Sequence, residues 1–208
     1  PADMQDQVAQ ARTEMMECVA EADDELMMKY LEGEELTDQE IRSGLAKGAK
    51  GGDLVLVFAG SAAGNVGVKL LLNAIANYMP SPADVQVKAV NGATEEEETL
   101  SVDPTGALVV QVFKTLADPF VGKLSYFRVF SGTLASDSRV FNVNKNAEER
   151  LGQLFMMRGK EQSPVAKVQA GDIGAVAKLT VTVTGDTLCD RGAPYRMPEI
   201  VYPEPLYS

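Results

Sequence analysis

Hydrophobic positions spaced as on a helix dominate the first part of the chain. From Met4 to Leu31 apolar residues recur at intervals of three, four and seven, which predicts one helix that ends near Gly33. Thr37 and Glu40 have the spacing of a capping box, in which each side chain accepts a hydrogen bond from the other residue's backbone amide. A second helix is therefore predicted from there to about Lys47. It is expected to bury Ile41 and Leu45.

An uninterrupted apolar run follows at residues 54–59, and its lack of alternation predicts a strand covered on both faces, as in α/β sheets. The run leads into a glycine-rich turn, residues 60–67, and then into a predicted helix from Val68 to Met79. Bare amides at such a turn suit anions, but neither the spacing G-x-x-x-x-G-K-[ST] nor the spacing G-x-G-x-x-G occurs. The turn is therefore not predicted to hold a phosphate. The helix is expected to bury Val68, Leu71, Leu72 and Ile75.

The second part of the chain consists of short β-rich runs, each ended by Gly, Pro, Asp or Asn. The predicted strands span 107–115, 124–131, 138–143, 149–157, 165–169, 171–179 and 186–188, with turns at 118–119, 136–137 and 144–146. The cleanest alternating face is formed by Ile173, Ala175, Ala177 and Leu179. This spacing predicts a small closed antiparallel β-barrel. The fold class is thus mixed α and β, with an α/β remnant of helices and one buried strand ahead of the barrel.

Two domains are expected because the segment between these parts contains helix-ending prolines and a run of like charges. Pro80-Ser81-Pro82 ends the preceding helix, and the glutamates at 95–98 form a like-charged run that is predicted to extend in solvent. The predicted organisation is a first domain at 1–90, an acidic linker at 91–102 and a barrel at 103–208.

The two parts of the chain differ in net charge. The net charge is -11, but residues 1–99 carry 19 acidic and 7 basic side chains, whereas residues 100–208 carry 11 and 12. Any contact with an anionic partner is therefore expected in the second part. No apolar run reaches the length of a membrane helix and the first thirty residues are acidic, so we expect a cytosolic protein without a membrane partner.

Candidate chemistry is sparse. The chain has no histidine, which excludes nucleophile systems that depend on it, and no catalytic residue is predicted. Cys18 and Cys189 lie far apart without a C-x-x-C pair, so neither a disulfide framework nor a metal site is supported. Both cysteines are expected to be buried, with a reactive thiol as the alternative. The acidic cluster Glu21, Asp23, Asp24 and Glu25 is expected to be a solvated helix face, with a metal-binding or general-acid group as the alternative.

Several stretches resemble elongation factor G, a ribosomal translocase family. They are Ala20 to Thr37, the triplet Gly60-Ser61-Ala62, the long run Phe113 to Leu134, and the segments 170–173 and 184–189. The resemblance implies the end of a GTP-binding domain with an inserted helical segment, followed by the family's second domain. Gly60, Ser61 and Ala62 then stand where the family contacts guanine. The chain departs from the family at Ala63, Gly64 and Val66, which favours a paralogue; a plain strand-to-helix turn is the alternative.

The resemblance also implies activity and partners. The whole protein would hydrolyse GTP with Mg²⁺ and promote movement of tRNA and mRNA, whereas this chain, lacking a phosphate-binding loop and initiator methionine, is expected to be an inactive piece that binds neither cofactor. The implied partners are the ribosome, small-subunit ribosomal RNA and the remaining domains of the same protein. The RNA-facing candidates are Lys123, Arg128, Arg158 and Lys160, within a group that also includes Arg139, Lys145 and Arg150.

Other interpretations stay open from sequence. The basic side chains could instead be ordinary surface charges paired with Asp137, Glu148 and Glu149. Ribosome-protection and peptide-release GTPases share the implied layout. A free-standing β-barrel protein-interaction module is the alternative from a different class.

Overall fold

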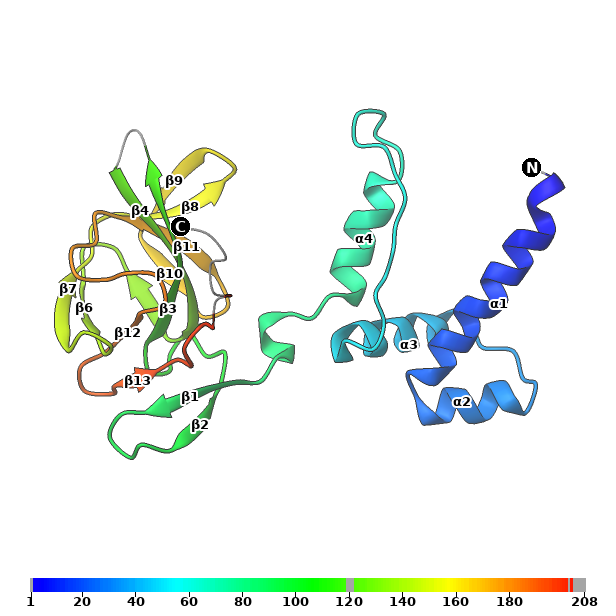
Figure 1. The fold of residues 1–208 in the computed structure, drawn as a ribbon, viewed down its shortest axis with the longest axis horizontal. Helices are drawn as coiled ribbons and strands as arrows, with labels where there is room; N and C mark the ends of the chain where they lie inside the picture. Colours follow the sequence, from blue (N-terminus) through cyan, green and yellow to red (C-terminus); the bar gives the residue numbers. More distant parts are fainter. Residues whose placement is uncertain (1, 119–121, 202, 204–208) are drawn as a thin grey trace. The chain divides into compact units, whose positions relative to one another are not determined.

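The computed structural model describes residues 2–118, 122–201 and 203, which fold as two compact units, Pro1–Ser81 and Pro82–Ser208 (Figure 1). None of the helices described in these ranges is long and apolar enough to cross a membrane.

Two helices occupy the region where one was predicted. A short 3-10 turn, η1 (Ala2–Met4), leads into α1 (Gln5–Glu21), and α2 (Asp24–Leu31) follows. The single-helix prediction is wrong because Asp23 adopts extended backbone and caps α2, where its carboxylate accepts hydrogen bonds from the amides of Glu25 at 2.9 Å and Leu26 at 3.4 Å. Gly33, at φ +80°, follows the end of α2 as predicted.

Helix α3 (Asp38–Gly51) completes the core of the first unit. Its predicted capping box is confirmed: the Thr37 hydroxyl accepts from the Glu40 amide and the Glu40 carboxylate accepts from the Thr37 amide. The core consists of Val19, Leu26, Leu36 and Ile41, with Met16 and Leu45 packed against it. Cys18 is exposed, not buried as predicted, because the adjacent Val19 and Ala20 take the core-facing positions of α1.

The predicted buried strand at 54–59 is absent from the described structure. These residues are extended but unpaired, and the side chains of Val55 and Val57 are 87% and 88% exposed. The following helix, α4 (Val68–Tyr78), forms as predicted but buries Ala74, while Leu71, Leu72 and Ile75 are exposed. Both burial predictions are wrong for one reason: a parallel strand is covered only when neighbouring strands and helices flank it, and the described part of this unit supplies no such strand.

The second unit is built on an antiparallel sheet of eight strands in the order β7-β6-β12-β3-β4-β11-β8-β9 (Figure 1). The strands are β3 (Val109–Asp118), β4 (Gly122–Ser131), β6 (Arg139–Asn142), β7 (Ala147–Arg150), β8 (Leu154–Arg158), β9 (Glu161–Val165), β11 (Ile173–Ala177) and β12 (Thr187–Cys189). Two short strands, β5 (Thr133–Ala135) and β10 (Lys167–Gln169), form a separate pair. The mixed α and β class with a large antiparallel sheet is confirmed, and closure of this sheet into a barrel stays a prediction.

The core of this unit is aliphatic around one aromatic ring. It contains Leu108, Val110, Val112, Phe127, Val129, Leu134, Val140, Leu151, Leu154, Val168, Val176, Leu179 and Leu188. The predicted strand 149–157 is broken, since residues 151–153 belong to no strand and separate β7 from β8, and both Leu151 and Leu154 are buried. The predicted turns at 136–137 and 144–146 are confirmed; in the turn at 118–119, Pro119 lies outside the described residues.

The alternating face predicted at residues 173–179 is confirmed only in part, since Ala175 and Leu179 are buried but the next positions along β11 face the core as well. Gly174 and Val176 face the core, and a Cβ on Gly174 would lie 2.7 Å from the Phe127 ring. Ile173 is exposed instead. Ala175 is nevertheless buried because its cross-strand neighbours on either side are aromatic, Tyr126 and Phe155.

Residues 91–102, predicted to be a linker, form part of a small sheet. A short 3-10 turn, η2 (Pro82–Asp84), precedes β1 (Val87–Asn91), which pairs with β2 (Glu97–Leu100) and β13 (Tyr195–Arg196). The second half of the like-charged run belongs to β2, where its glutamates have partners: Glu97 pairs with Lys88, and Glu98 accepts from the Tyr195 hydroxyl at 2.7 Å. With the division at Ser81, the first unit carries 14 acidic and 6 basic residues and the second carries 16 and 13. The charge contrast between the two parts is therefore smaller than between residues 1–99 and 100–208.

Candidate functional site

The turn from Gly60 to Gly67 is a tight hairpin ahead of α4. The backbones of Ser61 and Val66 exchange two hydrogen bonds, at 2.9 and 3.0 Å, and the Ser61 hydroxyl accepts from the Gly64 amide at 3.1 Å. A Cβ on Gly60 would lie 2.8 Å from the carbonyl oxygen of Val66, so only glycine fits there. Gly67 stands at φ +76° and begins α4 without a side-chain cap.

A shallow pocket of about 270 Å³ lies along this turn. All of its lining side chains are uncharged, and the predicted site residues Gly60, Ser61 and Ala62 lie together on its wall. Backbone amides and the Ser61 hydroxyl could contact a neutral ring in this pocket. The lining contains no cation that could bind a phosphate. In the described residues, no group of three or more carboxylates, cysteines or histidines could hold a metal ion.

The four RNA-facing candidates lie in three different surroundings. Arg158 and Lys160 are exposed at the β8–β9 hairpin, which contacts the β3–β4 hairpin through a hydrogen bond from Gln162 to Asp118 at 3.3 Å. Lys123 is half-buried, and its ammonium donates to the carbonyl of Thr182 at 2.7 Å. Arg128 lies farther along β4, with its guanidinium carbon 5.8 Å from the centre of the Phe130 ring.

Only part of the wider basic group is paired with carboxylates. Arg139 contacts Glu148 at 3.9 Å, and Arg191, which lies outside that group, contacts the same carboxylate at 3.2 Å. Glu149, which the sequence offered as a surface partner for these cations, is 2% exposed and binds backbone instead. Its carboxylate accepts hydrogen bonds from the amides of Thr180, Val181 and Thr182 and from two threonine hydroxyls.

The sequence did not predict that Glu149 is buried and hydrogen-bonded to residues 180–182. Burial by itself would raise the pKa of Glu149, but the hydrogen bonds from residues 180–182 outweigh it and lower the pKa. Asn142 extends the network, since its side-chain amide donates to the Thr182 hydroxyl at 3.1 Å and to Asp186 at 2.9 Å. The Thr-x-Thr pattern at 180–182 is the sequence signal that could have indicated it.

The buried thiol of the second unit has no sign of reactivity. Cys189 is fully buried, as predicted, and burial raises the pKa of its thiol. A raised pKa reduces the thiolate fraction at neutral pH.

Comparisons with known proteins bear on both units. Residues 107–191 match the family model described as elongation factor G domain 2. The fold is similar to a crystal structure of a protein from Thermus thermophilus, with 27% sequence identity and a TM-score of 0.72. That match covers 99% of this chain but 29% of the Thermus chain, so the present chain spans less than a third of its length.

Proposed function

We propose that this chain, an elongation factor G-like protein, is part of a translational GTPase that acts on the ribosome. The observation that carries the proposal is the match of residues 107–191 to the second domain of that factor. In the whole protein, GTP hydrolysis would promote movement of tRNA and mRNA through the ribosome.

The exposed apolar surface of the first unit supports a role inside a larger protein. This surface comprises Val55, Val57 and Phe58 of the extended run and Leu70, Leu71, Leu72 and Ile75 of α4. Exposed apolar side chains gathered in this way mark surfaces that pack against further protein, and Phe58 and Leu71 line one pocket. Residues 55–59 of the extended run belong to no strand of the described structure, so their backbone is available to pair with a strand of another domain. We assign this surface to contact with the remaining domains of the same protein.

GTP would be bound and hydrolysed mainly by parts of the whole protein outside this chain. Most of the binding energy for GTP comes from a phosphate cradle, its lysine and Mg²⁺. The turn at Gly60, Ser61 and Ala62 offers one uncharged edge for guanine. The chain by itself is therefore expected to bind GTP too weakly to measure and to leave it unhydrolysed.

Contact with small-subunit ribosomal RNA would run through the second unit. Arg158 and Lys160 are exposed cations on a projecting hairpin and form no ion pair with another described residue. Such side chains can neutralise phosphates without first breaking a protein contact. Lys123 contributes less, since its ammonium is already bonded to Thr182.

Binding of the 208-residue chain to purified small subunits tests the proposal. We expect a Kd of roughly 10⁻⁴ to 10⁻⁶ M that weakens steadily with added salt, because few phosphates are neutralised. Calorimetric titration with Mg²⁺ and GTP should give no heat of binding. Micromolar GTP affinity, or no small-subunit binding even at low salt, would count against it.

A further inference from the structure

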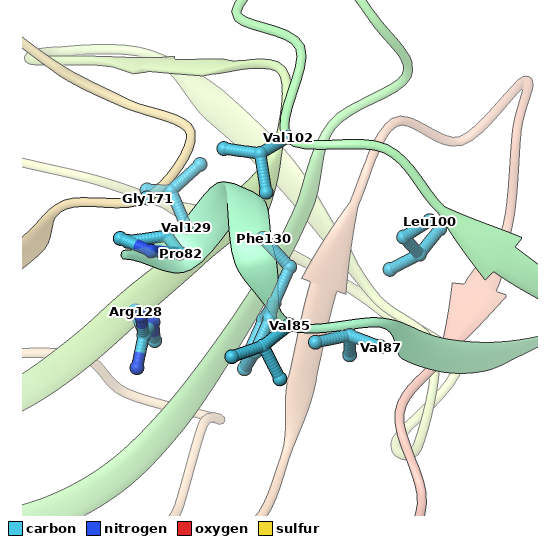
Figure 2. Close-up of a pocket in the computed structure, with 9 residues that line it drawn as sticks. All are labelled: Pro82, Val85, Val87, Leu100, Val102, Arg128, Val129, Phe130 and Gly171. Carbon is cyan, nitrogen blue, oxygen red and sulfur yellow. The ribbon is translucent and has the colours of Figure 1, made fainter. Parts of the chain in front are cut away.

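A small apolar pocket in the second unit is not used by the proposed function. It has a volume of about 80 Å³ and lies where η2 and the β1–β2 hairpin meet β4 (Figure 2). Its apolar walls are formed by Val85, Val87, Leu100, Val102 and Phe130. Gly171 closes one side, and a Cβ there would lie 3.3 Å from the Pro82 side chain, so the backbone approaches closely.

Arg128 is the single charged residue that lines this pocket. Its guanidinium lies over the ring of Phe130, which occupies one face of the cation and leaves the N–H edges available. No hydrogen bond or ion pair joins the Arg128 side chain to another described residue. A half-buried guanidinium without a carboxylate, next to an apolar pocket, is complementary to a ligand that carries both an apolar group and an anion.

The volume of the pocket limits the size of the apolar group that it can hold. An engineered protein cavity of about 150 Å³ holds benzene, so a pocket of roughly half that volume suits a branched aliphatic side chain better than an aromatic ring. The anion must then lie within a few ångströms of that side chain, because Arg128 itself lines the pocket.

The free C-terminal residue of a peptide meets both requirements. Its carboxylate and its side chain are attached to the same Cα. In an internal extended segment, by contrast, neighbouring side chains point to opposite faces, and residues two apart are separated by about 6.5 Å. We propose that this pocket binds the C-terminal residue of a peptide, with its aliphatic side chain between β1, β2 and Phe130 and its carboxylate paired with Arg128. This inference does not depend on ribosome binding.

The test compares ligands that differ in one group at a time. The ¹⁵N-labelled 208-residue chain is titrated with N-acetyl-Ala-Leu, with its C-terminal amide and with N-acetyl-Ala-Ala. We expect saturable shifts at the amides of Val129, Phe130 and Gly171, with a Kd on the order of 0.1–1 mM for the leucine acid. The amide should bind about tenfold or more weakly, because it loses a charge-assisted hydrogen bond.

Two variants locate the carboxylate contact. Arg128→Gln should weaken the acid about tenfold and leave the amide unchanged, whereas Arg139→Gln, whose arginine pairs with Glu148, should change neither. If Arg128→Gln loses the folded spectrum, the ratio of acid to amide on the unaltered chain decides alone. Equal affinity for acid and amide, equal affinity for the leucine and alanine acids, or no shifts at these amides up to about 10 mM would overturn the proposal.

Discussion

The carboxylate of Glu149 accepts two hydrogen bonds from Thr182, one from its amide and one from its hydroxyl, both at 2.9 Å. Together with the bonds from Thr180 and Val181, this contact fastens the loop between β11 and β12 to β7. Because no cation pairs with Glu149 in the described structure, backbone dipoles and hydroxyls stabilise its charge. The loop's conformation therefore depends on one ionised side chain.

Replacing Glu149 by glutamine should destabilise the second unit by about 1–3 kcal/mol, since the amide nitrogen cannot accept the bonds from Val181 and Thr182. The pKa of Glu149 is lowered in the folded state, so its stabilisation is complete above the unfolded pKa near 4.5 and is lost as pH falls through the lower folded value. Urea unfolding of Glu149→Gln and wild type should differ at pH 7 and converge in acid. Glu148→Gln, at an exposed position, is the matched control, and an equal effect of both would refute this role.

A second carboxyl group with a lowered pKa, that of Glu40, lies in the first unit. Hydrogen bonding to Lys29 at 2.8 Å, and then to Thr37, lowers the pKa of Glu40 to about 2. Its contribution to stability should therefore be complete above about pH 4.5 and should decline progressively as the pH falls from there through the folded pKa of about 2. Carboxyl NMR should report the low pKa directly. In Lys29→Met it should rise toward the ordinary value, and an unchanged pKa there would show that Lys29 is not the main cause.

Two shortened chains test the boundary of the second unit. Residues 82–208 retain β1, which pairs with β13 and covers a small core of Ala89, Val109 and Met197. Residues 103–208 lack β1 and β2, and therefore lose Ala89 and expose Val109 and Met197. The longer piece should unfold cooperatively, and the shorter one should melt at least about 5 °C lower, since a domain of this size loses several degrees per kcal/mol. Calorimetry giving equal Tm values would place the boundary after residue 102.

The features predicted correctly from the sequence were those that depend on residues close together in the chain. The capping box of Thr37 and Glu40 involves residues three apart, so its geometry follows from the helix itself. The turns at 136–137 and 144–146 are also local. The resemblance over the long run starting at Phe113 located the second domain for the same reason, since it depends on the order of residues alone.

The single helix predicted from Met4 to Leu31 failed for a local reason, the cap at Asp23, whereas the other main failures depended on partners far away in sequence. The run at 54–59 has the composition of a buried strand, but burial requires neighbours that the described part of the first unit does not contain. The glutamates at 95–98 have the composition of a solvated linker, yet Glu98 reaches Tyr195, 97 residues onward. Glu149 likewise meets threonines some 30 residues later. Charge in a sequence does not reveal such contacts.

The exposed valines of the first unit should tolerate polar replacement. Val55→Thr combined with Val57→Thr keeps the branched shape, and both side chains are already in water, so the Tm should stay nearly unchanged. Self-association and binding of a hydrophobic dye should fall. Val19→Thr, at a fully buried position, is the control expected to lower the Tm. A comparable loss of Tm in the double variant would mean that the apolar surface is covered within this chain.

The central claim, that the second unit contacts the small ribosomal subunit through its exposed cations, is tested most directly by cosedimentation across a salt series. Arg158→Glu combined with Lys160→Glu is compared with Arg12→Glu combined with Arg42→Glu, an equal charge change at exposed positions of the first unit. We predict that the first pair weakens small-subunit binding and reduces the log-log salt slope by about one for each lost phosphate contact, while the second pair retains the slope of the wild type. Unchanged binding in the first pair, or an equal loss in both, would contradict the account.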